Sequence, residues 1–190
     1  MLGKNLMKVL KCGLVGGIVL FIWGLFFWKG IVHPSGMYSR QAFANEAEVT
    51  NAIKNNAPKS GIYSLPNLAQ HRGDKEALEA ARQQRAQGPF VVASVQLEGK
   101  ASGMMNAGLK LLILKIVLVS IVSWFIFQAG KMDYKRTVKS MTMGGVLVAL
   151  AMIVPTMVFF GFPGNFAFLI FIDTVIGWFL AGIAVGKFCK

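Results

Sequence analysis

Two ionisable side chains interrupt long apolar stretches of this sequence: Lys115 lies within Leu109–Gln128, and Asp173 lies within Phe166–Lys187. An ionisable group at the centre of a bilayer costs on the order of 2.5–3.5 kcal/mol, so such groups pair with one another or mark ion and proton pathways. Pro155 interrupts another apolar stretch, where it leaves helix backbone groups without partners. These residues predict charge pairing, or the binding and relay of an ion, inside a membrane.

The three residues are predicted to share one layer of the membrane. With the outer boundary placed at the ends of the apolar stretches, a rise of about 1.5 Å per residue puts Lys115 roughly 13 Å inside. The same arithmetic puts Asp173 roughly 12 Å and Pro155 about 10 Å inside. We therefore expect an ion pair between Lys115 and Asp173, next to the backbone groups that Pro155 frees.

Each charged group has an alternative to this ion pair. Lys115 can extend its long stem toward the outer head groups, as Lys110 can do more easily. Asp173 has one methylene and cannot reach that far, so its alternative is a structural hydrogen bond to a neighbouring helix. The groups available for that bond are Thr174, Ser120, Ser123 and a tryptophan N–H.

Four apolar segments position these residues. The chain is 55% hydrophobic and 15% charged, well below the roughly 25% charged residues of a soluble domain. Three segments approach the roughly 20 residues that cross a bilayer, and the first is predicted to be an uncleaved signal anchor because no small-residue cleavage site follows it. The predicted spans are Gly13–Trp28, Leu109–Gln128, Met141–Phe160 and Phe166–Lys187.

The basic residues predict the orientation of the spans. The net charge of +12 is concentrated near the ends of apolar segments, which favours anionic lipid head groups over nucleic acid as the partner. The positive-inside rule then places both termini in the cytoplasm and Gly30–Asn106 outside. The residues that set this orientation are Lys4, Lys8, Lys11, Lys131, Lys135, Arg136, Lys139, Lys187 and Lys190.

The outer segment is too long to be a simple connection. Helices are expected over Asn45–Asn56 and Asp74–Gln87, and strands over Gly61–Pro66 and Pro89–Leu97. The predicted fold is a membrane all-α protein, in which a four-transmembrane-helix bundle carries a small extracytoplasmic α+β cap between helices 1 and 2. The cap is expected to be a strand pair with one or two helices over it. The predicted domains are residues 1–29, 30–106 and 107–190, with a basic cytoplasmic loop over 130–140.

Small residues in the spans predict close helix packing. The fourth span carries two small-xxx-small pairs, and the first span has glycines roughly along one side. Glycine is common in membrane helices for other reasons, so this pattern alone assigns no function. The residues concerned are Gly177, Ala181, Gly182 and Gly186 in the fourth span, and Gly13, Gly17 and Gly24 in the first.

No catalytic, cofactor-binding or metal-binding motif is recognised, so we expect a protein that is not an enzyme and has no cofactor. The histidines, His33 and His71, lie far apart in the sequence without clustered ligands. Cys12 and Cys189 lie near opposite ends of the chain without a CxxC partner, and are expected to be free thiols near the membrane surface.

Several short stretches resemble a group of uncharacterised bacterial four-span inner-membrane proteins. The resemblance covers most of the chain and implies a bacterial inner-membrane location but no activity. After the first span this chain has Trp28-Lys29-Gly30-Ile31-Val32-His33-Pro34, which departs from the tighter Trp-Pro pattern of the group, so no role for His33 is implied. The matching stretches are Ala57-Pro58, Gly61-Ile62-Tyr63-Ser64-Leu65-Pro66, Gly88-Pro89-Phe90, Gly161-Phe162-Pro163, Asp173 and Ile176-Gly177-Trp178-Phe179-Leu180-Ala181-Gly182.

The function expected first is that of an accessory or assembly subunit of an inner-membrane complex. Its partners would be the lipid bilayer and either another membrane protein or further copies of itself, and not nucleic acid. The alternative is a small transporter or ion-conducting protein that uses Asp173 and Lys115. A third, weaker hypothesis is a lipid-modifying enzyme with His33, Tyr63 and Asp173 as its groups.

Overall fold

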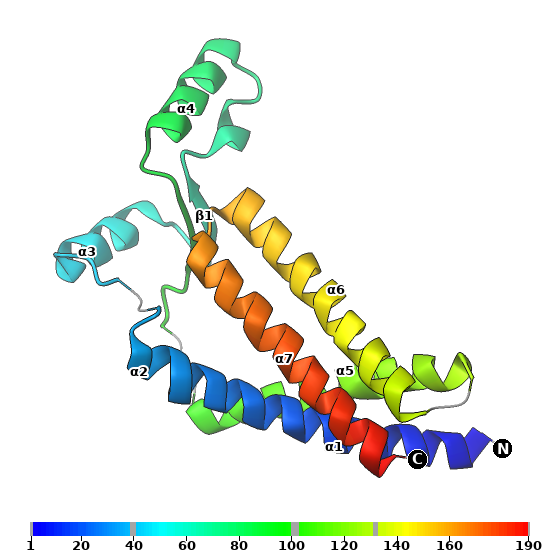
Figure 1. The fold of residues 1–190 in the computed structure, drawn as a ribbon. Coiled ribbons are helices and arrows are strands. Elements are labelled where there is room, and N and C mark those ends of the chain that lie inside the picture. Colours follow the sequence, from blue (N-terminus) through cyan, green and yellow to red (C-terminus); the bar gives the residue numbers. More distant parts are fainter. Residues whose placement is uncertain (1, 39–40, 100–102, 131–132, 190) are drawn as a thin grey trace. The chain divides into compact units, whose positions relative to one another are not determined.

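The structure is a computed structural model that describes residues 2–38, 41–99, 103–130 and 133–189. The chain divides into two compact units. Residues 1–39 and 102–190 form the first, here called the membrane unit, and residues 40–101 form the second, here called the inserted unit. Each unit is described by itself (Figure 1).

The membrane unit contains four helices that are long and apolar enough to cross a membrane, as the sequence predicted. The first span runs on as a helix to Ser35, beyond the predicted end at Trp28. The third begins earlier than predicted, because the Asp133 side chain caps it by accepting a hydrogen bond from the Arg136 backbone N–H. The elements are α1 (Leu2–Leu25), η1 (Phe26–Val32), α2 (His33–Ser35), α5 (Met104–Gln128), α6 (Tyr134–Phe160) and α7 (Gly164–Phe188).

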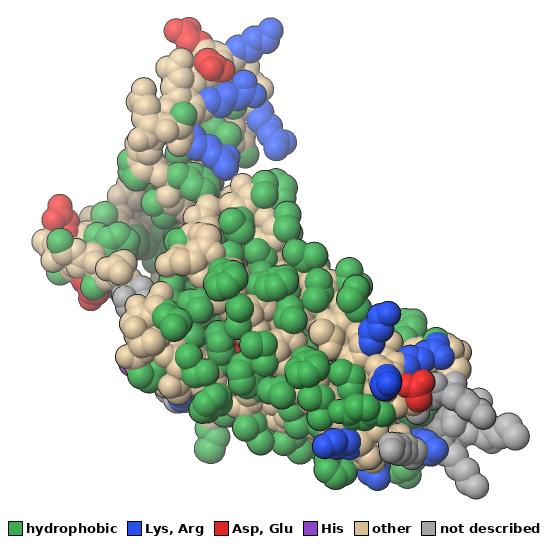
Figure 2. Space-filling model, in the orientation of Figure 1, with side chains coloured by type: hydrophobic (Ala, Val, Ile, Leu, Met, Phe, Trp, Pro, Cys, Tyr) green, Lys and Arg blue, Asp and Glu red, His purple; other side chains and the backbone are tan. Residues whose placement is uncertain are grey.

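The four spans pack as a row rather than as a closed bundle. Extensive packing joins α5 to α1, α1 to α7 and α7 to α6, whereas α5 meets α6 only briefly. In Figure 1, α6 and α7 run side by side, and α1 crosses α7. The central helices are therefore α1 and α7. Figure 2 shows apolar side chains over the visible face of this unit, with Lys and Arg gathered where α6 begins.

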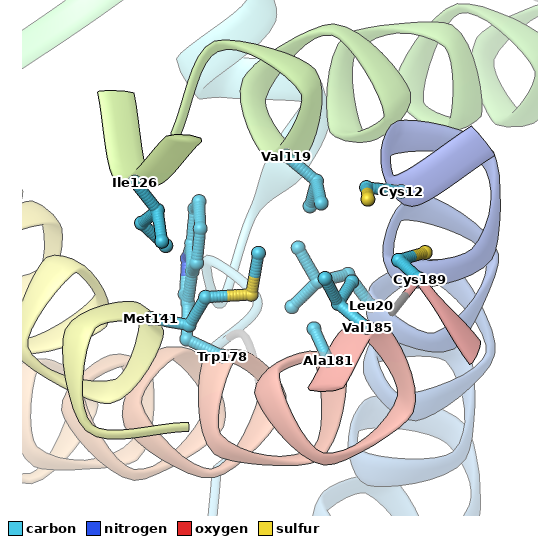
Figure 3. Close-up of a cluster of buried hydrophobic side chains, with 9 residues drawn as sticks. All are labelled: Cys12, Leu20, Val119, Ile126, Met141, Trp178, Ala181, Val185 and Cys189. Atoms are coloured by element: carbon cyan, nitrogen blue, oxygen red, sulfur yellow. The ribbon is translucent and has the colours of Figure 1, made fainter. Parts of the chain in front are cut away.

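One buried cluster joins side chains from all four spans (Figure 3). In this cluster Trp178 of α7 lies between Ile126 of α5 and Met141 of α6. The central spans contribute four further positions, and Cys189, which follows α7, contributes another. The full set is Cys12, Leu20, Val119, Ile126, Met141, Trp178, Ala181, Val185 and Cys189.

Glycines let the spans approach closely, as the sequence predicted. A Cβ atom on Gly17 would lie 2.6 Å from the Ile116 Cα of α5. Gly182 faces α6 in the same way, where a Cβ would lie 3.1 Å from the Val138 Cα. Gly186 abuts Tyr134, and Ala181 is fully buried. Contact between backbones is a general means of helix association in lipid.

The inserted unit is built from short elements that local hydrogen bonds define. Asn45 caps α3 by accepting from the Glu48 N–H, and Asp74 caps α4 by accepting from the N–H groups of Glu76 and Ala77. Both helices therefore begin where the sequence predicted. The elements are α3 (Glu46–Asn56), β1 (Gly61–Leu65), η2 (Leu68–His71), α4 (Lys75–Gln87) and β2 (Val91–Val95).

The two strands pair antiparallel, with Tyr63 opposite Ala93. The strand pair itself was expected, but the helices over it were not confirmed. Neither α3 nor α4 packs along either strand, and both extend away from the sheet in Figure 1. The physical reason is that the helices have no apolar stripe to place on it: no residue of α3 is buried, and Ala81 is the buried residue of α4.

Candidate intramembrane polar site

Asp173 of α7 is the centre of a polar contact between the two central spans. The indole N–H of Trp28 donates to the Asp173 carboxylate oxygen Oδ2 over 2.8 Å. The indole N–H of Trp23 donates to the Asp173 backbone carbonyl over 3.0 Å. The tryptophan alternative for Asp173 is therefore the one observed. A hydrogen bond to a charged acceptor is roughly twice as strong as one between neutral groups, so this contact fixes α7 against the first span.

The first span changes its winding where these indoles reach Asp173. Phe26–Val32 is a π-helix, and the His33 backbone N–H donates to the carbonyl of Trp28, five residues earlier. In an α-helix, residues five apart lie about 140° apart around the axis. The wider π turn brings Trp28 round toward the side that carries Trp23, and both indoles meet the same residue. Turns of this kind inside α-helices occur frequently at functional sites.

Small and aromatic residues complete the surroundings of the contact. Gly177 lies one turn after Asp173, and a Cβ there would lie 2.9 Å from the Trp23 ring, so the glycine makes room for this indole. On the other side, the Trp28 and Phe166 rings lie 6.0 Å apart between centroids. Apolar packing thus surrounds the carboxylate and lowers the local dielectric, which strengthens its hydrogen bonds.

Lys115 approaches the same layer from α5 without touching the carboxylate. Its ammonium lies beside Gly24 of α1, 3.9 Å from where a Cβ would stand. No nitrogen–oxygen contact within 4.0 Å joins Lys115 to Asp173, both of which the structure describes. The two charges nevertheless attract each other through space. The direct ion pair expected from the sequence is thus replaced by a longer-range attraction across α1.

The structure does not group the other predicted residues with this contact. Pro155 lies on the exposed side of α6, because Ile153 is the neighbour that packs toward α7. Lys110 is also exposed, which suits an ammonium extending toward head groups. His33 is exposed at the end of the first span, and the Tyr63 hydroxyl donates to the Lys59 carbonyl within the inserted unit.

This arrangement can hold the Asp173 carboxylate between three spans. It can also hold a cation that takes the place of Lys115 as the counter-charge of Asp173. Indole N–H groups donate and do not accept, so Trp28 is satisfied by the Asp173 side-chain oxygen and Trp23 by the Asp173 backbone carbonyl. Among the described residues, no three His, Cys, Asp or Glu side chains gather to hold a metal ion.

A second polar cluster, which was not predicted from the sequence, is formed by Cys12, Cys189 and Ser123. Both cysteines are free thiols, as the sequence predicted, and both are buried within the protein and contact each other. The Ser123 hydroxyl is fully buried. The number of spans could have indicated that the two cysteines lie near each other. With an even number of spans, the two ends of the chain return to the same side of the membrane.

Comparisons with protein-family models, with curated proteins and with solved structures find no match for this chain.

Proposed function

We propose that this chain is a non-catalytic integral membrane protein that acts through contacts, as an accessory or assembly subunit of a bacterial inner-membrane complex. Both termini are placed in the cytoplasm by the positive-inside rule, which puts the inserted unit outside. In this proposal the membrane unit is a rigid anchor and the inserted unit meets an extracytoplasmic partner.

The observation that carries the proposal is the exposed apolar surface of the β1–β2 sheet. Ile62 is 80% exposed, although it is a large apolar residue in the middle of a strand. On the other face, Leu65 and Val91 form a cross-strand pair in which both side chains are exposed. An isolated two-stranded sheet is marginally stable in water, so a partner that covers it would stabilise it.

The backbone of the sheet offers a second means of contact. Each strand pairs with the other along one edge, which leaves an outer edge on each that no described strand covers. Such an edge presents N–H and C=O groups that pair with an added strand. The partner therefore fits as a protein segment with alternating apolar side chains.

The polar contact around Asp173 supports the anchor role. Its carboxylate is engaged by Trp28, and the attraction of Lys115 links a third span to the same layer. Interhelical hydrogen bonds of this kind stabilise membrane helix association by about 0.6–2 kcal/mol each. A fixed anchor suits a protein whose specificity lies in the inserted unit.

The test is a mild-detergent purification of the tagged chain from its native membrane, compared with variants. We expect one defined complex in stoichiometric yield with the wild type and with Gln83→Ser, which alters an exposed residue of α4. Ile62→Ser and Leu65→Ser should lose the partner while the chain stays folded in the membrane. Recovery of the chain alone, as a monomer or homo-oligomer, would contradict the proposal.

A second candidate function is a small transporter or ion-conducting protein. It is favoured by Lys115 and Asp173, two half-buried side chains of opposite charge in the spans that are not joined by a direct ion pair. Reconstitution into lipid vesicles tests it. Cation or proton flux that Asp173→Asn abolishes in a folded protein would support this function, and wild-type vesicles as tight as empty ones would reject it.

A further inference from the structure

Two cysteines far apart in the sequence meet at one buried position. Cys12 is fully buried in α1, and Cys189 follows α7 with 5% of its surface exposed. Their side chains contact each other, and Figure 3 shows both at the edge of the buried cluster. The contact brings together two thiols, which are soft ligands for metals, and they are the two cysteines of the sequence.

A third group at this position lacks a partner. Ser123 of α5 has its hydroxyl fully buried, and this Oγ is the one buried side-chain polar atom among the described residues without a hydrogen bond. It lies close to the Cys12 sulfur. A neutral thiol is a weak acceptor, so the hydroxyl gains little from it. Leaving a buried hydroxyl unpaired costs about 1–3 kcal/mol, which calls for an explanation.

We propose that Cys12 and Cys189 bind one Cu(I) ion as thiolates, with the Ser123 hydroxyl donating a hydrogen bond to the Cys12 sulfur. A thiolate is a charged acceptor, so it satisfies the hydroxyl that a thiol leaves unpaired. A disulfide between the cysteines would leave the same hydroxyl without a charged partner. The orphan hydroxyl therefore favours metal-bound thiolates over both other states of the cysteines.

The number and type of ligands select the metal. Soft thiolates favour Cu(I), zinc and iron–sulfur clusters. Structural zinc requires four ligands and clusters require several thiolates, but this position offers two sulfurs. Cu(I), a soft ion with a filled d shell, is stable with two thiolates. The site is thus suited to a monovalent soft cation.

The charge of the bound complex is opposite to that of the basic residues near both cysteines in the sequence. Binding joins Cu(I) to two thiols, forms two copper–sulfur bonds and releases two protons to solvent, with no change in oxidation state. The product carries one negative charge. Lys8 and Lys11 lie within a turn of Cys12, and Lys187 lies two residues before Cys189, so basic side chains surround the position in sequence. Their charge favours the anionic complex over an unbound state.

The test uses the full chain in detergent, reduced, freed of metal and kept under nitrogen. Cu(I) is supplied by a coloured competing chelator, so that transfer is measured by absorbance and copper per chain by elemental analysis. We expect one Cu(I) per wild-type chain. Cys12→Ser and Cys189→Ser should each abolish transfer, and Cys189→Ala should do the same, with circular dichroism showing that each variant is folded.

The serine variants test whether the Ser123 hydroxyl bonds to a metal ligand or only packs beside it. Ser123→Ala should weaken Cu(I) binding about 10-fold, as expected for a lost hydrogen bond to a metal ligand. Ser120→Ala is the matched control, because this serine lies nearly one turn earlier on α5 and its hydroxyl already donates to the Ile116 carbonyl. It should bind Cu(I) as the wild type does.

Two results would overturn the proposal. The first is a folded wild type that leaves all copper on the chelator, or cysteine variants that take up as much copper as the wild type. The second is a reduced protein that takes up no Cu(I) but, after exposure to oxygen, loses both alkylatable thiols by intact mass. That outcome would identify a disulfide-forming pair instead.

Discussion

The membrane unit and the inserted unit are each stabilised internally, and the kind of contact differs between them. In the membrane unit, residues distant in sequence meet: Trp28 and Asp173 are separated by 145 positions, and large side chains such as Met141 and Trp178 are buried. In the inserted unit, caps such as Asp74 bond to N–H groups two and three residues ahead. Its buried residues are small, namely Ala57, Pro66 and Ala81.

This difference indicates where each unit is sensitive to change. The membrane unit depends on specific fits between helices, so a single added side chain can separate two spans. The inserted unit has little core, so its helices depend on local hydrogen bonds and its strands on their pairing with each other, and large apolar side chains such as Ile62 stay exposed. In the proposed function, rigidity and recognition are thus divided between the two units.

The largest effect is expected for Gly17→Leu. A Cβ at Gly17 already lies 2.6 Å from the Ile116 backbone, so the larger side chain must separate α1 from α5, at a cost of about 3 kcal/mol or more. The thermal midpoint in detergent, followed by tryptophan fluorescence, should fall sharply. Gly144→Leu is the control, because nothing lies within 4 Å of its Cβ position. Equal losses of thermal stability in both variants would contradict the close packing of α1 against α5.

Asp173→Ala is expected to destabilise the membrane unit by about 2 kcal/mol, because the Trp28 N–H loses its charged acceptor in an apolar setting. Asp173→Asn keeps an acceptor oxygen and should lose less. Unfolding in mixed micelles of increasing denaturing-detergent content measures both. If the two variants were equally unstable, the negative charge and not the hydrogen bond would be what the contact requires.

Trp28→Phe is expected to cost about 1 kcal/mol, the typical contribution of a hydrogen bond, since the ring volume is largely retained. Combined with Asp173→Ala, its effect should be less than additive. Trp124→Phe provides the control, because that indole is 48% exposed. Additive losses for the Trp28 and Asp173 changes would mean that the two residues stabilise the protein independently.

The smallest and most local effect is expected for Asp74→Ala. Loss of the cap should destabilise α4 by about 1 kcal/mol, seen as faster amide hydrogen exchange over Lys75–Gln87. The midpoint of the membrane unit should stay unchanged. A global loss of protection would show that the inserted unit is stabilised by more than its local hydrogen bonds.

The sequence predicted the elements whose causes are local. Apolar runs fixed the four spans, and Asn45 and Asp74 fixed the starts of two helices. It did not predict the order of the spans, and it left a tryptophan N–H as one of several alternatives for Asp173, because both depend on which face of α7 meets the first span. Pro155 was misplaced for the same reason: the packing of Ile153 decides which side of α6 turns outward.

The row of spans also has a consequence for biogenesis. Its flanking contacts, α1 with α5 and α6 with α7, each join spans that follow one another along the chain, so each pair can form as a hairpin soon after insertion. The contact of α1 and η1 with α7 joins the first span to the last and includes both indole hydrogen bonds to Asp173. Until α7 emerges, the two tryptophans have no acceptor there. We therefore expect the protein to assemble as two hairpins that dock last through Asp173.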